Sequence, residues 1–127
     1  MSMPLTLKKI LQSIKNMQTE IITNENGTAI KYPDGTMICT LQTTVTDQAI
    51  ENAYGSLYQS IRIWTFPVPF ISRPAVSCSE AQWGTGCSWG SVRGANATTA
   101  TLRIIDAFPR KTGTNVSISA IAIGRWK

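Results

Sequence analysis

The spacing of hydrophobic residues changes once along this chain, near residue 24. Before that point, apolar residues recur at alternating intervals of four and three, which is the seam of a coiled-coil heptad on a helix. After it, apolar and polar residues alternate in short runs separated by Gly, Pro and Asn, as in strands with one buried face. The seam residues are Met3, Leu7, Ile10, Ile14, Met17 and Ile21.

Residues 1–23 are predicted to form a helical trimerisation stalk. Ser2 and Pro4 suit the first turn of a helix, and the polar run from Asn24 to Gly27 suits its end. A narrow apolar stripe on so short a helix is not stable alone in water, so we expect it to pack against copies of itself. Leu or Ile at one seam position and Ile at the other favour three or four helices over two. An amphipathic helix folded back on its own domain is the alternative.

Residues 24–127 are predicted to form a mainly β domain, an antiparallel sandwich of six or seven strands. The alternation is clearest from Thr36 to Thr46, while residues 47–56 read as a polar connection with room for a helical turn. No crossover helix separates the strands, which argues against a parallel α/β fold. The inward residues of the clearest strand are Met37, Cys39, Leu41 and Val45, and further strands are expected at 28–32, 57–66, 75–79, 101–107 and 116–123.

Composition narrows the possible partners. The net charge is +5, but the basic residues are scattered, whereas a nucleic-acid-binding face is usually clustered. No apolar run reaches the roughly 18 residues of a membrane span, and no secretory signal is recognisable. Cys39, Cys78 and Cys87 form an odd set that favours reduced thiols. Cys39 and Cys78 fit the core, and a bond between Cys78 and Cys87 stays open.

The sequence lacks the residues that several kinds of catalytic or metal site need. The chain has no histidine, which excludes Ser-His-Asp and Cys-His nucleophilic sites and histidine-ligated zinc. Three cysteines are too few for a four-thiolate zinc site. None of the seven carboxylates forms a recognisable acid–base pair. We therefore expect no enzyme activity, no metal and no cofactor.

A segment rich in glycine and serine carries the best candidates for recognition. Trp83 and Trp89 lie in it, and Arg93 follows closely. Aromatic rings stack on the apolar C–H face of sugars, and a guanidinium can bind hydroxyls or an acidic sugar. These three residues are the predicted glycan-binding set, although either tryptophan could instead close the end of the core. Trp64 and Trp126 are expected in the core or at a subunit contact.

Three segments resemble parts of a known family. Residues 31–39 are similar to the Lys-aromatic-x-Asp-Gly opening of the C-terminal domains of bacteriophage tail fibres. Residues 64–76 resemble the Phe-Pro and Pro-x-Val strand and turn of those domains, and residues 121–126 resemble their Gly-Arg-Trp ending. The order of the three segments is also the same. Such domains are similar to the H-type lectins, which are trimeric β-sandwiches that bind sugars near subunit boundaries.

The resemblance implies a phage or prophage tail-fibre or tail-tip protein, made in the bacterial cytoplasm and located in the virion tail. It would be a homotrimer that binds a bacterial surface carbohydrate and attaches to other tail or virion proteins. This sequence is much shorter than a full fibre with its shaft and attachment domain, so it is expected to be a fragment, a small separate tip subunit or a related protein attached by its N-terminal helices. The Trp83–Trp89 segment matches no family motif. A structural virion subunit, such as a collar, baseplate or decoration protein without a glycan site, is the alternative. An enzyme that degrades surface polysaccharide is the third possibility.

Overall fold

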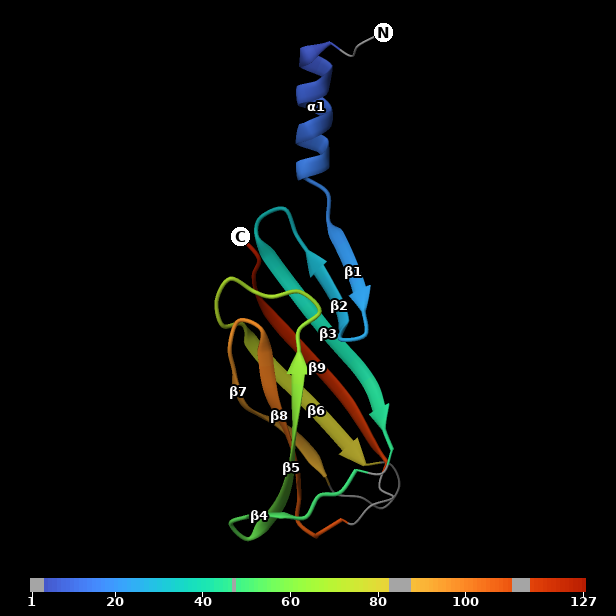
Figure 1. Cartoon of the computed structure of the whole chain (residues 1–127), viewed down its shortest axis with the longest axis vertical. Helices are drawn as coiled ribbons and strands as arrows, with labels where there is room; N and C mark the ends of the chain where they lie inside the picture. Colours follow the sequence, from blue (N-terminus) through green and yellow to red (C-terminus); the bar gives the residue numbers. More distant parts are fainter. Residues whose placement is uncertain (1–3, 47, 83–87, 111–114) are drawn as a thin grey trace.

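The computed structural model is an antiparallel β-sandwich with one helix projecting from one end (Figure 1). The prediction of a mainly β, antiparallel fold is confirmed, but the described part of the chain holds nine strands rather than six or seven. The structure describes residues 4–46, 48–82, 88–110 and 115–127. The elements are α1 (Leu5–Asn16), β1 (Glu20–Asn24), β2 (Gly27–Lys31), β3 (Thr36–Val45), β4 (Asn52–Tyr54), β5 (Leu57–Thr65), β6 (Ala75–Gln82), β7 (Trp89–Ala95), β8 (Thr99–Asp106) and β9 (Val116–Arg125).

The helix is shorter than the predicted stalk of residues 1–23, because α1 ends at Asn16. The run from Ile21 to Thr23 consists of β-branched residues, which favour strands, and it pairs with β2 as part of β1. The prediction that Ile21 continues the helical seam is therefore wrong. The antiparallel pairing of this segment with β2 outweighed the heptad spacing, which favoured a helix.

The remaining seam residues are exposed. No residue of α1 is buried, so the helix does not fold back against the sandwich. Leu7, Ile10 and Ile14 lie on α1, Met17 is its C-cap residue, and Met3, like Ser2, lies outside the described residues. Because these aliphatic residues are exposed on a projecting helix, their packing against helices of other copies stays a prediction.

The first sheet has five strands in the order β1-β2-β3-β9-β6. Its inner face follows the alternation read from the sequence, since Met37 and Cys39 on β3 and Ile118 on β9 are fully or almost fully buried. Its outer face carries an isoleucine row, which crosses four neighbouring strands through direct register pairs. The isoleucine row consists of Ile21, Ile30, Ile38 and Ile123.

The second sheet has four strands in the order β4-β5-β8-β7. Trp64 on its inner face confirms the core prediction: its ring meets Phe66 edge-on at 5.0 Å, and its Nε1 donates to the carbonyl of Asn26 at 2.8 Å. The expected helical turn within residues 47–56 is not found in the described part of that segment. Instead β4 forms there, and buried Ile50 bridges to Arg110.

The segments that carry the family resemblance meet at the helix end of the sandwich. The side chain of Asp34 accepts the N–H of Thr36 at 2.8 Å, which closes the turn before β3 and lowers the pKa of that carboxyl. Trp126 donates its Nε1 to the carbonyl of Tyr32 at 2.8 Å, which ties the Gly-Arg-Trp segment to this turn. The half-buried Trp126 is thereby anchored against the core.

A glycine makes the third segment fit. A Cβ on Gly124 would lie 2.9 Å from the ring of Phe70, so only glycine allows this close approach without a shift. The N–H of Ile71 also donates to the carbonyl of Arg125 at 3.0 Å. The motif residues are thus explained by packing and turn geometry rather than by chemistry.

The cysteines behave as small core residues where they are described. Cys39 is fully buried, and burial raises the pKa of its thiol to about 11. Cys78 is half-buried and packs against the core. Cys87 lies outside the described residues, as does any bond it makes.

Candidate glycan-binding face

The outer face of the four-stranded sheet brings together aromatic and polar side chains from all four of its strands. Trp89 on β7 pairs with Ile105 on β8, which pairs with Gln59 on β5. The next outward row along the same strands contains Arg103 and Ile61. Since alternate residues of β8 point into the core, these neighbours share the opposite, outer face. We call Tyr54, Gln59, Trp89 and Arg103 the Trp89 face.

Arg103 and Tyr54 form a stacked, hydrogen-bonded pair on this face. The Arg103 guanidinium carbon lies 4.5 Å from the centre of the Tyr54 ring, and its Nη1 donates to the Tyr54 hydroxyl at 3.0 Å. Tyr54 reaches this position because Gly55, with φ of 60°, turns the chain between β4 and β5. A guanidinium over a phenol ring keeps further N–H donors beyond the one that the hydroxyl accepts.

The side chains on this outer face cover an apolar residue, Ile105. Ile105 is only 6% exposed, although it lies outside the core cluster of the sandwich. Its register partners on either side are Gln59 and Trp89, and Arg103 precedes it by two residues on the same face. The Trp89 face is therefore a packed layer and not a set of isolated surface residues.

Two polar atoms in this layer have unused hydrogen-bonding capacity. Gln59 Oε1 and Arg103 Nε are buried and make no hydrogen bond within the described part of the chain. A buried acceptor or donor without a partner is unfavourable, so a shift of these side chains that gave the two atoms a partner would be stabilising. Polar groups lying among aromatic rings are characteristic of ligand sites.

A buried carboxylate holds the residue just before β7, which begins at Trp89. Asp106 is fully buried and accepts hydrogen bonds from Ser88 Oγ at 2.6 Å and from the N–H of Phe108 at 2.9 Å. Arg110 Nε donates to the same carboxylate at 3.0 Å and forms an ion pair with it. This network holds Ser88, the neighbour of Trp89, against the end of β8.

The structure places two of the three predicted glycan-binding residues, Trp89 and Arg93, at different sites on β7. Trp89 is 43% exposed on the outer face, so of its two possible roles the surface role fits and the core role does not. Trp83 lies outside the described residues. Arg93 lies further along β7 beside a β-bulge, where it lines another groove together with Arg73. Trp89 is not among the residues that line that groove in the described chain.

Sequence reasoning missed Tyr54, Gln59 and Arg103. The Tyr-Gly-Ser sequence at residues 54–56 is a turn signal that could have indicated the β4–β5 hairpin. Nothing local indicates that Arg103 lies against Tyr54, because this contact depends on the register of β5 with β8.

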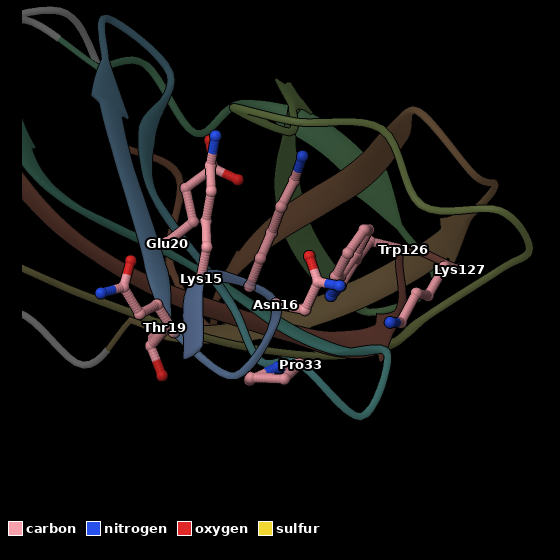
Figure 2. Close-up of a pocket in the computed structure, with 9 residues that line it drawn as sticks. Lys15, Asn16, Thr19, Glu20, Pro33, Trp126 and Lys127 are labelled. Carbon is pink, nitrogen blue, oxygen red and sulfur yellow. The ribbon is translucent and has the colours of Figure 1, made fainter. Parts of the chain in front are cut away.

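A second concave region, the lysine pocket, lies between the end of α1 and the C-terminal residues (Figure 2). It encloses about 520 Å³. The ammonium groups of Lys31 and Lys127 lie 5.2 and 5.0 Å from the centre of the Trp126 ring, and Lys15 and Glu20 also line the pocket. Its aromatic residue thus already serves as a partner for two cations of the chain itself.

Within the described residues, no group of three or more His, Cys, Asp or Glu side chains could hold a metal ion. The described helix is also too short and too polar to cross a membrane.

The fold has counterparts among solved structures. An N-truncated R1-type pyocin tail fibre matches with a TM-score of 0.63 and 14% identity, covering 98% of this chain and 99% of that chain. The C-terminal part of the R1 pyocin fibre of P. aeruginosa matches with a TM-score of 0.62 and 17% identity. It covers 84% of this chain, which spans only 28% of that fibre chain. The tailspike of Pseudomonas phage phi297 matches with a TM-score of 0.51 and 13% identity, over 70% of this chain and 15% of that chain.

No family model matches the sequence, and no curated protein matches it. The structural likeness nevertheless confirms, at the level of fold, the resemblance to tail-fibre C-terminal domains that the three segments indicate. The likeness to H-type lectins stays a prediction.

Proposed function

We propose that this chain is the receptor-binding part of a tail fibre or tail tip and that its Trp89 face binds a bacterial surface glycan. The observation that carries the proposal is the exposed Trp89 in one packed layer with the stacked pair of Tyr54 and Arg103. The shared fold with pyocin tail fibres and a phage tailspike supports a place in the virion tail.

The chemistry of the Trp89 face suits a sugar. The indole of Trp89 offers an apolar surface for the C–H face of a pyranose ring. Arg103 and Gln59 offer donors and acceptors of the kind that bind hydroxyl groups. One shallow site of this kind binds with a Kd of about 1 mM. No step of this recognition needs a catalytic group, a metal or a cofactor.

The proposed assembly is a homotrimer, and two apolar surfaces support it. One is the stripe of Leu7, Ile10 and Ile14 on the projecting helix. The other is the isoleucine row on the outer face of the five-stranded sheet, and it includes Ile21, which follows the helical stripe at heptad spacing. Copies packed through both surfaces would bury them together and leave the four-stranded sheets facing solvent. Three weak sites on one tip would raise the avidity by orders of magnitude.

The polarity of the molecule agrees with this assembly. The helix α1 lies at one end in Figure 1, and β4, which ends at Tyr54 of the Trp89 face, lies at the other. The stalk end would attach to other tail or virion proteins, while the opposite end would meet the host cell.

Binding of the full chain to an array of purified bacterial surface polysaccharides tests the glycan proposal. Trp89→Ala and Tyr54→Ala should each weaken binding about tenfold or more, because each removes an exposed aromatic platform. Thr40→Ala, on the outer face of the other sheet, is the matched control and should bind normally. Circular dichroism would verify the fold of each variant. Normal binding by both aromatic variants would reject the Trp89 face, and a chain that binds no polysaccharide would favour the structural virion subunit.

Light scattering tests the assembly. The full chain should have three times the mass of one chain, and a chain lacking residues 1–17 should keep its sandwich but associate more weakly. This truncation removes α1 and spares β1, which begins at Glu20. A monomeric full chain would contradict the trimer.

A further inference from the structure

A groove between the edge strands β6 and β7 carries two arginines that the Trp89 face does not use. Arg73 lies just before β6, and Arg93 lies on β7 at the break in register between Val92 and Gly94. Both side chains line the groove, which encloses about 400 Å³. Val76, at its base, is half-buried and packs against the core of the sandwich. We call this region the arginine groove.

The charges in the arginine groove are not compensated by the protein. Neither Arg73 nor Arg93 has an ion pair or a hydrogen bond from its side chain within the described part of the chain. No acidic residue is among those described as lining the groove. Two like charges facing one cleft repel each other, and an anion between them would relieve that repulsion.

We infer that the arginine groove binds the anionic group of an acidic sugar, either a carboxylate or a phosphate. The inference rests on the proposed glycan function and specifies the class of the glycan. A guanidinium presents a planar fork of N–H donors that matches both anions, and such charge-assisted bonds are the stronger kind. Val76 and Val92 offer an apolar base for the C–H face of the same sugar.

The lysine pocket is a weaker candidate for the same anion (Figure 2). Its lining includes the carboxylate of Glu20, and its Lys31 and Lys127 ammoniums already lie over the ring of Trp126. Lysine also acts as a strongly hydrated point charge and has no fork geometry. The lysine pocket is therefore the natural control, since it also carries positive charges in a similar volume elsewhere on the molecule.

A glycine allows the groove to be filled without disturbing the fold. A Cβ added at Gly94 would meet no atom within 4 Å, so a larger side chain fits there in open space. Gly94 also lines the arginine groove. Gly94→Leu should therefore block the groove while keeping both arginines and the thermal stability of the domain.

The experiment is an NMR titration of the full, isotope-labelled chain with four probes. Galacturonate carries a carboxylate and glucose 6-phosphate carries a phosphate, while galactose and glucose are their neutral counterparts. The Nε–Hε signals of Arg73 and Arg93 should move with one or both anionic sugars at a Kd of about 1 mM and should stay unmoved by the neutral sugars. The stronger of the two anionic probes identifies the carboxylate or the phosphate as the natural group.

Variants separate a built site from general charge attraction. The double change Arg73→Gln with Arg93→Gln should weaken anion binding about tenfold or more, and Gly94→Leu should weaken it as well. The double change Lys31→Gln with Lys127→Gln removes the same charge from the lysine pocket and should leave binding unchanged.

Equal weakening by both double variants, or equal binding of neutral and anionic sugars, would overturn the inference. These results are distinct from a failure of the proposed function. An arginine groove that binds the small probes in a chain that binds no polysaccharide would reject the proposed function and keep the anion site.

Discussion

The outer faces of the two sheets cover the same core from opposite sides, yet their chemistry differs. The face of the five-stranded sheet carries the isoleucine row and, beside it, small hydroxyl side chains such as Thr40 and Ser119. The face of the four-stranded sheet carries Trp89 and the stacked Tyr54–Arg103 pair. Short aliphatic and hydroxyl side chains give a flat surface that a copy of the chain can cover. Aromatic rings with spare donors and acceptors suit a polar ligand.

The inner faces differ as well. Among the described residues, those of the five-stranded sheet that are buried are apolar, with Cys39 the only titratable group among the fully buried ones. The inner face of the four-stranded sheet holds the charged Asp106, paired with Arg110. The sheet proposed to bind ligand thus also contains the polar network that positions its ligand-facing strand.

The largest effect should come from charging the isoleucine row. Ile38→Glu combined with Ile123→Glu places two like charges in the contact proposed between copies, where burial of an unpaired charge is strongly unfavourable. The mass by light scattering should fall to that of one chain, while circular dichroism stays that of a β-sandwich.

The matched control is Ile61→Glu combined with Ile63→Glu, on the outer face of the four-stranded sheet. Both of these isoleucines are exposed, and Ile63 is the more so at 68%. This variant should keep the mass of the assembly. If the assembly dissociates here and not with the first variant, the roles assigned to the two faces are reversed.

The next largest effect should be on stability. Asp106→Ala removes the acceptor for Ser88, Phe108 and Arg110, and loss of one partner of a buried ion pair destabilises a protein by about 3 kcal/mol. Urea unfolding followed by tryptophan fluorescence would measure the loss. Asp34→Ala, an exposed carboxylate at the turn before β3, should lose much less. Equal losses would show that the buried network does not hold the four-stranded sheet.

A smaller effect, on binding, should follow from replacing the exposed Trp89, and the core residue Trp64 is its reference. Trp89→Ala should weaken binding to the recognised polysaccharide by about 1–2 kcal/mol and leave the free energy of unfolding nearly unchanged, because Trp89 is half exposed. Trp64→Ala should do the opposite and destabilise the domain by about 3 kcal/mol or more, since Trp64 fills the core. Surface-plasmon binding and urea unfolding on both variants separate the two roles. A Trp89 variant that unfolds easily would return this residue to the core.

The smallest effect concerns the apolar inner face. The folded thiol of Cys39 has a pKa of about 11 against an ordinary value of 9.0, because the thiolate is unfavourable where it is buried. The unfolded chain loses this proton first as the pH rises above 9, so stability should be complete below that pH and decline toward pH 11. The free energy of unfolding from urea curves should fall by about 1 kcal/mol between pH 9 and pH 10, and Cys39→Val should remove this part of the slope. An unchanged slope in the variant would assign it to other groups.

The sequence by itself determined much of this molecule. Alternation along residues 36–46 and 116–123 indicated two strands, found as β3 and β9, whose inward residues are buried or half-buried. The three motif segments indicated the fold that the solved tail-fibre structures share. These features are local, because burial on one face leaves a period of two in the strand itself.

Tertiary structure decided the rest. Ile21 followed the heptad spacing but entered β1, because pairing with Ile30 satisfied its backbone in a sheet. Two features join residues far apart in the chain. Arg103 contacts Tyr54, and Arg73 and Arg93 line the same groove. A period shows which face a side chain occupies, but its neighbours on that face depend on strand order and register. Those are set only when the whole sandwich has formed around its core.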